Sequence, residues 1–322
     1  MKILLTGAFG NIGTSTLEEL IKRGHHVTCF DIKTKANENV AQNLNGKAEI
    51  LWGDLRVRRD VAAAVRDQDA VVHLAFVIPR LSATGISSED DPQWAKDINV
   101  GGTCNLIEGI KAQPHPPKIL FSSSLHVYGK TQHLPPPRNI NDIPQPIEHY
   151  AKHKVECEEL IKDSGLDWTI FRLGASLPMR LVLDPAMFEV PLDNRIEFIH
   201  RKDVALAIAN ALECEQVWGR TWLIGGGSNC QLFQRELVAS VLDAIGIGML
   251  PEEAFPNEPY PTDWLDTIES QEILEFQQRT LQDYLQELRV KIGFRRHLIR
   301  FFRPIIRAWL LSKSPVWGSR NA

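Results

Sequence analysis

The chain has 322 residues, 43% of them hydrophobic and 24% charged, with a formal net charge of -4, which suits one large α/β domain with an appended lobe. No window approaches the ~20 apolar residues of a membrane-spanning helix, and the apolar start breaks into glycines too soon for a signal peptide. The five cysteines form no CxxC pair, so we expect neither a metal site nor a disulfide framework, and a reducing cytoplasm fits best.

Residues 2–13 (KILLTGAFGNIG) contain three evenly spaced glycines. A short apolar run predicts a buried strand, and a helical pattern extends from Thr14 to Arg23. Gly7 permits a sharp turn, Gly10 lets the backbone approach a pyrophosphate, and Gly13 lets the helix pack on the strand. The spacing predicts a grip for a dinucleotide at the start of the first helix. A plain glycine-rich turn is the alternative.

The second predicted strand, His25 to Phe30, ends at Asp31. A carboxylate here accepts hydrogen bonds from the ribose hydroxyls and repels a 2′-phosphate, so Asp31 favours NAD over NADP. Lys33 and Lys35 follow closely and weaken that discrimination.

Further patterns continue the alternation of strands and helices: strands at 48–52, 70–75 and 118–122, and helices at 61–66 and 94–110. Residues 77–92 between them are expected to form a loop. Nearly all-apolar runs such as 70–75 are what a parallel sheet buried on both faces requires. The order therefore predicts a doubly wound parallel sheet.

A second informative stretch follows the strand at 118–122. Tyr150 and Lys154 open a predicted helix and lie on one face of it, because they are four residues apart. A lysine ammonium beside a phenol lowers the pKa of the phenol from about 10 toward neutral pH, which makes a proton shuttle. A pair of solvated surface residues is the alternative. Tyr150 and Lys154 follow the strand at 118–122, and ligands bind at the carboxyl ends of the strands in such a sheet, which favours the proton shuttle.

Taken together, these motifs resemble the extended short-chain dehydrogenase/reductase family, the group of NAD-dependent epimerases and dehydratases. The matching blocks cover residues 2 to about 230 in the right order: Thr6-Gly7-x-x-Gly10-x-x-Gly13, Asp31, Gly53-Asp54-Leu55, His73-Leu74-Ala75, Asn99, Ser124 with Val127-Tyr128-Gly129, Tyr150-x-x-x-Lys154, Phe171-Arg172-Leu173 and His200-Arg201-Lys202-Asp203. The resemblance implies a Rossmann-like fold with a smaller substrate lobe.

The resemblance also implies roles for individual residues. Ser124 would hold the substrate oxygen, Tyr150 would exchange a proton, and Lys154 would hold the nicotinamide ribose. NAD is the implied cofactor, with NADP less favoured, and its site would be formed by Gly7, Phe9, Gly10, Asn11, Ile12, Gly13, Asp31, Asp54, Leu55, Leu74, Ala75, Tyr150 and Lys154. In that set Asp54 would contact the adenine, and Leu74 and Ala75 would line its pocket. A homodimer is implied in the same way.

Two departures from the family bear on the substrate. Its 4,6-dehydratases place an Asp-Glu pair directly after the catalytic Ser or Thr, where this chain has Leu125 and His126, so dehydration is disfavoured. His126 is either a proton-carrying group or, as is commoner near a strand end, a structural residue. Residues 173–178 (LGASLP) replace an Asn-Val-Tyr-Gly-Pro-like turn, which weakens the case for a nucleotide sugar.

The resulting organisation has three parts: a Rossmann-like domain (1–175, rejoined by 200–228), a substrate lobe (176–199 and 229–290) and a basic amphipathic tail (291–322). In the lobe we expect a helix over 231–246. The segment 263–276 is expected to pack on the lobe and do no chemistry.

The tail is unusual in its charge. From Arg289 to Ala322 there are nine Lys or Arg and no Asp or Glu, so this stretch carries +9 and the remainder −13. Its arginines recur at helical spacing, with large apolar residues on the other side. Two interpretations stay open: an amphipathic helix on an anionic membrane surface, or one docked on its own domain or a second subunit. Nucleic acid is disfavoured because no binding motif accompanies the charge.

We therefore expect an NAD(P)-dependent oxidoreductase or epimerase, cytoplasmic or peripheral to a membrane. It would act on a secondary alcohol or ketone, sugar-derived or lipophilic, by hydride transfer. Epimerases and dehydrogenases use the same Ser, Tyr and Lys, so the sequence does not separate them. The alternative is a dinucleotide-sensing or membrane-recruited binding protein without turnover. Ser124, Tyr150 and Lys154 argue against that alternative, since a sensor does not need them.

Overall fold

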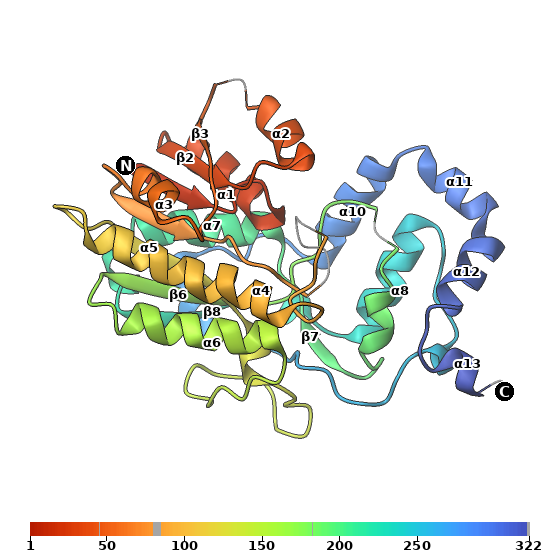
Figure 1. Cartoon of the computed structure of the whole chain (residues 1–322). Helices are drawn as coiled ribbons and strands as arrows, with labels where there is room; N and C mark the ends of the chain where they lie inside the picture. The colour runs from red at the N-terminus through yellow and green to blue at the C-terminus, as the bar shows by residue number, and fades with distance from the viewer. Residues whose placement is uncertain (45, 80–84, 182, 321–322) are drawn as a thin grey trace.

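A computed structural model describes residues 1–44, 46–79, 85–181 and 183–320. The middle of the predicted 77–92 loop, at 80–84, and the last two residues of the predicted tail lie outside the described residues. Figure 1 shows a sheet with helices on both faces, and a smaller lobe beside it that is formed mainly by the second half of the chain.

The sheet has seven strands in the order β3-β2-β1-β4-β5-β6-β8. Their bounds are β1 Lys2–Thr6, β2 His26–Asp31, β3 Glu49–Trp52, β4 Ala70–His73, β5 Lys118–Ser124, β6 Trp168–Leu173 and β8 Arg220–Ile224. All neighbouring strands run parallel. The predicted doubly wound parallel sheet is confirmed, and the strand order reverses between β1 and β4, where such sheets bind ligands.

Helices cover both faces of the sheet because each strand carries apolar side chains on both sides. In β1, Ile3 and Leu5 join one core cluster and Leu4 joins the other. The first cluster packs under α1 Asn11–Lys22, α2 Lys35–Gln42, α7 Arg201–Leu212 and α9 Ile268–Leu274. The second packs under α3 Arg58–Ala64, α5 Gly102–Lys111 and α6 His149–Lys162.

The smaller lobe has a third core cluster, which joins residues from 179–199, the region after Gly227 and the tail. In it β7 Arg195–Glu197 pairs antiparallel with β9 Gln231–Phe233. Its helices are α8 Gln234–Ile245, α10 Leu281–Ile292, α11 Arg295–Phe301, α12 Arg303–Leu311 and the short α13 Trp317–Arg320. The exact boundaries predicted for the three parts stay a prediction.

Several predicted helices begin or end elsewhere. α1 begins at Asn11 instead of Thr14, because the extended Gly10 is its N-cap. The helix expected over 94–110 consists of α4 Pro92–Lys96, a π turn over Asp97–Gly101, and α5. The helix expected over 231–246 starts three residues late, because those residues form β9.

The tail is not one helix. Gly293, with a φ of +53°, ends α10, and Pro304 stands in the first turn of α12, where its missing N–H costs no helical hydrogen bond. The sequence pattern showed the helical periodicity of 296–310. Gly293 separates this stretch from α10, and the break at Phe302 divides it into α11 and α12.

Candidate active site

Glycines shape the turn between β1 and α1. Gly7 has a φ of +67°, and a Cβ there would lie 2.7 Å from the backbone nitrogen of Ala75 after β4. A Cβ on Gly13 would overlap the carbonyl oxygen of Gly7. Gly10 is exposed, and the nearest atom to a Cβ there would be that same oxygen, at 3.3 Å. The turn is closed toward the protein and open at Gly10, which fits a pyrophosphate against the backbone.

Asp31 ends β2 beside this turn. Its Oδ2 accepts a hydrogen bond from the backbone N–H of Phe9 at 3.1 Å, and its Oδ1 accepts one from Nδ2 of Asn37 at 3.2 Å. Burial raises the pKa of Asp31, while the bonds from the N–H groups of Phe9 and Ile32 oppose that rise. Asn37 lies in α2, an element for which the sequence analysis made no prediction. The carboxylate thus ties the glycine turn to the end of β2.

The residues expected around the adenine differ in what they contact. Asp54 holds Arg56, whose Nη2 lies 2.6 Å from its Oδ2, and this pair lowers the pKa of Asp54. Leu55 is 5% exposed and belongs to the core under α3 and α5. Leu74 and Ala75 are half-buried at the end of β4, next to the glycine turn.

Ser124 and Tyr150 meet at the carboxyl end of the sheet. Ser124 is the last residue of β5 and Tyr150 is the second residue of α6, and their hydroxyls lie close enough for Ser124 to lower the pKa of Tyr150. Burial nevertheless raises the pKa of Tyr150 to about 12, and the nearby Glu148 adds to this rise. The structure therefore brings the predicted serine and tyrosine together.

Lys154 lies one helical turn further along α6 and is 3% exposed. Its Nζ donates a hydrogen bond to the carbonyl of Ser122, and lies 3.5 Å from the ring centroid of Phe76 but 5.8 Å from that of Tyr150. Burial lowers the pKa of Lys154 to about 7. The prediction that Lys154 lowers the pKa of Tyr150 is wrong for this arrangement. Burial of the phenol has the largest effect on that pKa, and the Lys154 ammonium is held at the carbonyl of Ser122, away from the phenol.

A histidine and a glutamate flank Tyr150. His126 Nδ1 lies 2.7 Å from Oε2 of Glu148. The His126 ring stands at 86° to the Tyr150 ring with centroids 6.0 Å apart, and at 88° to the Tyr260 ring with centroids 5.6 Å apart. His126 therefore lies beside Tyr150, and both interpretations, a proton-carrying group and a hydrogen-bonded structural residue, stay open. Glu148 and Tyr260 carry no sequence motif, so only the fold reveals them.

The loop that follows β4 supports the start of α6. The carboxylate of Glu89 accepts hydrogen bonds from the backbone N–H groups of His149 and Tyr150, at 3.1 and 2.9 Å. Asn99, in the π turn, holds the beginning of the same loop through both backbone groups of Val77, at 2.7 and 3.0 Å. Glu89 satisfies two donors of the first helical turn and places a negative charge at the positive end of the helix. The loop thus helps to fix Tyr150.

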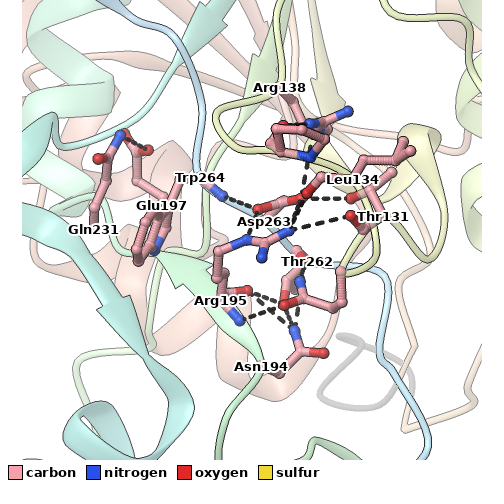
Figure 2. Close-up of polar contacts among 12 residues, drawn as sticks. Thr131, Leu134, Arg138, Asn194, Arg195, Glu197, Gln231, Thr262, Asp263 and Trp264 are labelled. Carbon is pink, nitrogen blue, oxygen red and sulfur yellow. Dashed lines mark hydrogen bonds and ion pairs between the residues drawn. The ribbon is translucent and has the colours of Figure 1, made fainter.

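Figure 2 shows a buried polar network that joins the loop 129–148 to β7 and to the segment 262–264. Asp263 is 1% exposed and accepts hydrogen bonds from Thr131 Oγ1 at 2.7 Å and Arg195 Nε at 2.6 Å. Its Oδ2 also lies 3.4 Å from Nε of Arg138. Both arginines are thus paired with a buried carboxylate. The segment 263–276 was expected to pack on the lobe. Its start contacts β7 and the 129–148 loop, but Ile273, Leu274 and Phe276 pack in the first core cluster of the sheet, so the prediction is correct only for its start.

Glu197, at the end of β7, is fully buried. Its carboxylate accepts hydrogen bonds from the backbone N–H of Leu265 at 2.7 Å, the N–H of Gly227 at 3.0 Å and Nε2 of Gln231 at 3.1 Å. Burial nevertheless raises its pKa to about 7. No sequence motif marks Glu197 as a site residue.

Neither a metal site nor a membrane span is found in the described parts of the chain. Within them, no cluster of three or more His, Cys, Asp or Glu is arranged to hold a metal ion. No helix among the described residues is long and apolar enough to cross a bilayer.

The NAD dependent epimerase/dehydratase family model matches residues 3–176. A UDP-glucose 4-epimerase of Pisum sativum is 34% identical over 173 residues, which are 50% of this chain and 47% of that protein. A UDP-glucose 4-epimerase of Klebsiella pneumoniae is 34% identical over 141 residues, 42% of this chain and 97% of that sequence. The chain spans about half the length of most of the curated relatives it matches.

Solved structures match over more of the chain. A UDP-glucuronic acid 4-epimerase of Bacillus cereus, in complex with UDP-glucuronic acid and NAD, has a TM-score of 0.74 at 21% identity, covering 91% of this chain and 99% of that one. A UDP-glucose 4-epimerase of Bifidobacterium longum, in complex with NAD+ and UDP, has a TM-score of 0.73 at 20% identity, covering 92% and 99%. At this identity the likeness concerns the fold.

Proposed function

This chain belongs to the NAD-dependent epimerase/dehydratase family, and we propose that it is an NAD-dependent enzyme that acts on a secondary alcohol or ketone by hydride transfer. The observation that supports this most directly is the proximity of the Ser124 and Tyr150 hydroxyls, with Lys154 one turn along α6. The pair lies at the carboxyl ends of the strands, beside the open glycine turn, where ligands bind in such sheets.

The residues around the turn fit NAD. The backbone at Gly10 is open to a pyrophosphate, and the side chain of Asp31 stands where a ribose would be held. Half-buried Leu74 and Ala75 would line the adenine side, and Lys154 would hold the nicotinamide ribose. NAD, when bound, supplies the C4 atom that takes up or returns a hydride.

The proton steps fall to this chain's own residues. In oxidation, Ser124 Oγ would hydrogen-bond the substrate oxygen. Tyr150 would first pass its own proton to His126 or to solvent, and its phenolate Oη would then take the proton of the substrate hydroxyl. The C–H bond breaks with its electron pair leaving as hydride, and a C=O bond forms. In reduction the same groups act in reverse, so Tyr150 returns the proton. The pair of His126 and Glu148 beside Tyr150 would hold the substrate or relay that proton.

The relatives' names support an epimerase, in which a keto intermediate is reduced again on its opposite face. A dehydrogenase or reductase that releases the ketone or alcohol remains the alternative, because both use the same three residues. The substrate class is less constrained. The family match ends at residue 176, and most of the predicted substrate lobe follows it.

Two features of the lobe bear on the substrate. Residues 173–178 differ from the turn expected for nucleotide-sugar enzymes. Arg138 is paired with Asp142 and Asp263, and Arg195 with Asp263, so the two cationic charges are already matched by two carboxylates. We therefore propose a sugar-derived or lipophilic secondary alcohol, and we keep nucleotide sugars in the test panel.

A dinucleotide sensor without turnover is the competing function. It would need the glycine turn and Asp31, but it would gain nothing from a serine hydroxyl placed against a buried phenol. The cytoplasm as location and the homodimer implied by the family resemblance are part of the proposal.

The experiment that tests the function is a titration of the purified chain with NAD(H) and NADP(H), followed by a panel of secondary alcohols, ketones and nucleotide sugars. Reduced nicotinamide is followed by absorbance, and products are analysed by mass spectrometry and NMR. A substrate-dependent absorbance change supports a dehydrogenase, and a change of stereochemistry without net absorbance change supports an epimerase. NAD(H) binding with neither outcome supports the sensor. Absence of binding contradicts the proposal.

A further inference from the structure

The tail is docked on the lobe along one side. Ile299 and Leu310 are 9% and 0% exposed and belong to the core cluster of the lobe. Further on, Ser314 Oγ donates a hydrogen bond to the carbonyl of Ala254 at 2.6 Å. The interpretation of the tail as a helix docked on its own chain is thus correct for this side.

Two of the predicted row of arginines also face the lobe. Arg307 Nη1 donates hydrogen bonds to the carbonyls of Gly248 and Met249 at 3.1 and 2.5 Å, and Arg296 Nη2 donates one to the carbonyl of Asp243 at 3.2 Å. These carbonyls lie at and just beyond the C-terminal end of α8, where cations compensate for the missing helical hydrogen bonds and for the helix dipole. Arg296 and Arg307 are therefore engaged within the protein.

Large apolar side chains lie on the side of the tail that faces away from the lobe. We call them the outer stripe, and they are 44% to 78% exposed: Val290, Phe294, Leu298, Phe301, Phe302, Ile305 and Trp309. Steps of three or four residues relate most of them, which keeps them on one side of their helices. Figure 1 shows α11 and α12 at the outer edge of the lobe, away from the sheet. A contiguous set of this size marks an interaction surface.

Further cations alternate in the sequence with the residues of the outer stripe, and two of them, Arg300 and Arg303, also pack against Gly246 and Gly248 of the lobe. Lys291, Arg295, Arg300, Arg303 and Lys313 are exposed, and residues 289–322 contain no Asp or Glu. Nζ of Lys313 lies 5.9 Å from the ring centroid of Trp309. Exposed aromatic and aliphatic groups bordered by lysine and arginine are the features of helices that lie in the interface of an anionic bilayer.

We propose that residues 290–313 form a docking surface for an anionic phospholipid membrane. The outer stripe enters the interfacial layer, and the surrounding lysines and arginines contact the lipid phosphates. The contact is peripheral, since no helix within the described ranges has the length and apolarity to span a bilayer. The inference does not depend on the proposed enzymatic function.

Other occupants fit the surface less well. A symmetric dimer through the tail would place the same +9 segment of two copies together, and like charges repel at such an interface. A nucleic acid would use the cations but leave the outer stripe in water, because its affinity comes mainly from phosphate contacts.

The test uses the full chain and vesicle flotation. Vesicles contain phosphatidylcholine alone or with about one third phosphatidylglycerol, so that only the second kind has a negative surface potential. The first variant is Phe301→Ser with Ile305→Ser, at two positions that are 78% and 68% exposed, so the lobe core stays intact. The matched control is Ile143→Ser with Ile268→Ser, 77% and 70% exposed elsewhere. Deletion of the tail is less informative, because it removes Ile299 and Leu310 from the core.

We expect the wild type to float with anionic vesicles and not with neutral ones. Partitioning should fall about 10-fold or more in the stripe variant and stay unchanged in the control. Replacing Lys291, Arg295 and Arg300 by Gln should weaken binding as well, most clearly at low salt. Absence of binding to anionic vesicles overturns the proposal. So does equal loss in the control, or a stripe variant that changes only the oligomeric state in analytical ultracentrifugation, which would assign the surface to a second copy.

Discussion

His126 and Glu148 form a close pair, with Nδ1 and Oε2 2.7 Å apart, and the His126 ring meets the Tyr150 ring edge to face. The Glu148 carboxylate contributes to the raised pKa of Tyr150, because a negative charge disfavours the phenolate. The pair therefore acts on the group that we assign to proton transfer.

Glu148→Gln should lower the pKa of Tyr150, since the neutral amide no longer opposes the phenolate. In the pH profile of kcat/KM, the limb that reports the ionisation of Tyr150 then moves to lower pH. His126→Asn should lower kcat roughly 10- to 100-fold, because the group beside Tyr150 that can relay its proton is lost. Glu156→Gln is the control, because Glu156 pairs with Lys96 at 3.0 Å on the surface of α6. An unchanged profile in Glu148→Gln would argue that the pair is only structural.

Tyr150→Phe should reduce turnover by about 10²- to 10⁴-fold. NAD(H) affinity should change little, because Tyr150 is one of many residues of the expected cofactor site and the substitution removes only its hydroxyl. The control is Tyr128→Phe. The Tyr128 hydroxyl donates to the carbonyl of Asn139 at 3.1 Å and accepts from Arg172 at 2.9 Å, so its loss should affect stability more than rate. If both variants keep turnover, the assignment of Tyr150 fails.

Asp31→Asn should weaken NAD binding about 10- to 100-fold, the amount expected when charged hydrogen bonds are lost. The preference for NAD over NADP should narrow, because the amide does not repel a 2′-phosphate. Isothermal titration with both cofactors measures the ratio. Asp163→Asn, at an exposed position after α6, is the control. An unchanged ratio would show that Asp31 is not at the ribose.

The stability of the protein should depend on Glu197 between pH 4.5 and 7. Its pKa is raised from 4.5 to about 7, so the folded state binds a proton that the unfolded state releases. The free energy of unfolding is therefore higher below pH 4.5 and declines as the pH rises to 7, by up to about 3 kcal/mol. In Glu197→Gln this decline should be smaller, and in the exposed control Glu258→Gln it should persist. Urea unfolding at several pH values tests this; parallel curves for wild type and Glu197→Gln would contradict it.

Asp263→Asn should lower the free energy of unfolding by about 3 kcal/mol, because Arg138 and Arg195 lose a buried counter-charge. Urea denaturation measures the change. Asp266→Asn is the control. Asp266 is exposed, and within the described residues its carboxylate accepts one hydrogen bond, from the backbone N–H of Ile268 at 3.3 Å. A loss smaller than about 1 kcal/mol would place the network among weak surface pairs.

Local patterns were sufficient to predict the sheet and the glycine turn. The strands around Leu4, Val72 and Leu120 are almost uninterrupted apolar runs, as burial on both faces requires. Gly7 and Gly13 were correctly identified because their backbone conformation and contacts admit no side chain. Helix limits were less well predicted, because caps such as Gly10 and breaks such as Gly293 depend on backbone angles that a periodic pattern does not contain.

The candidate site was predicted only in part. The pairing of Ser124 with Tyr150 was foreseen through a family resemblance, but the pKa of Tyr150 was not, because burial depends on what the fold packs around the ring. Glu148 and Glu89 were missed, since their roles arise from contacts between segments far apart in the chain. Arg296 and Arg307 appeared equivalent to the exposed arginines in sequence, and only the position of α8 separates them.

The network around Asp263 also limits how the protein can be recombined. A chimera that takes its lobe from a relative after residue 176, where the family match ends, would replace Asp263 and Arg195 but keep Thr131 and Arg138. Arg138 would then have lost a counter-ion, and β8 would have to be supplied again from the original chain. A workable exchange must therefore move the 129–148 loop together with the lobe and leave 200–228 in place. The segments that build the lobe and those that build the sheet alternate along this chain, so neither part can be exchanged as one continuous segment.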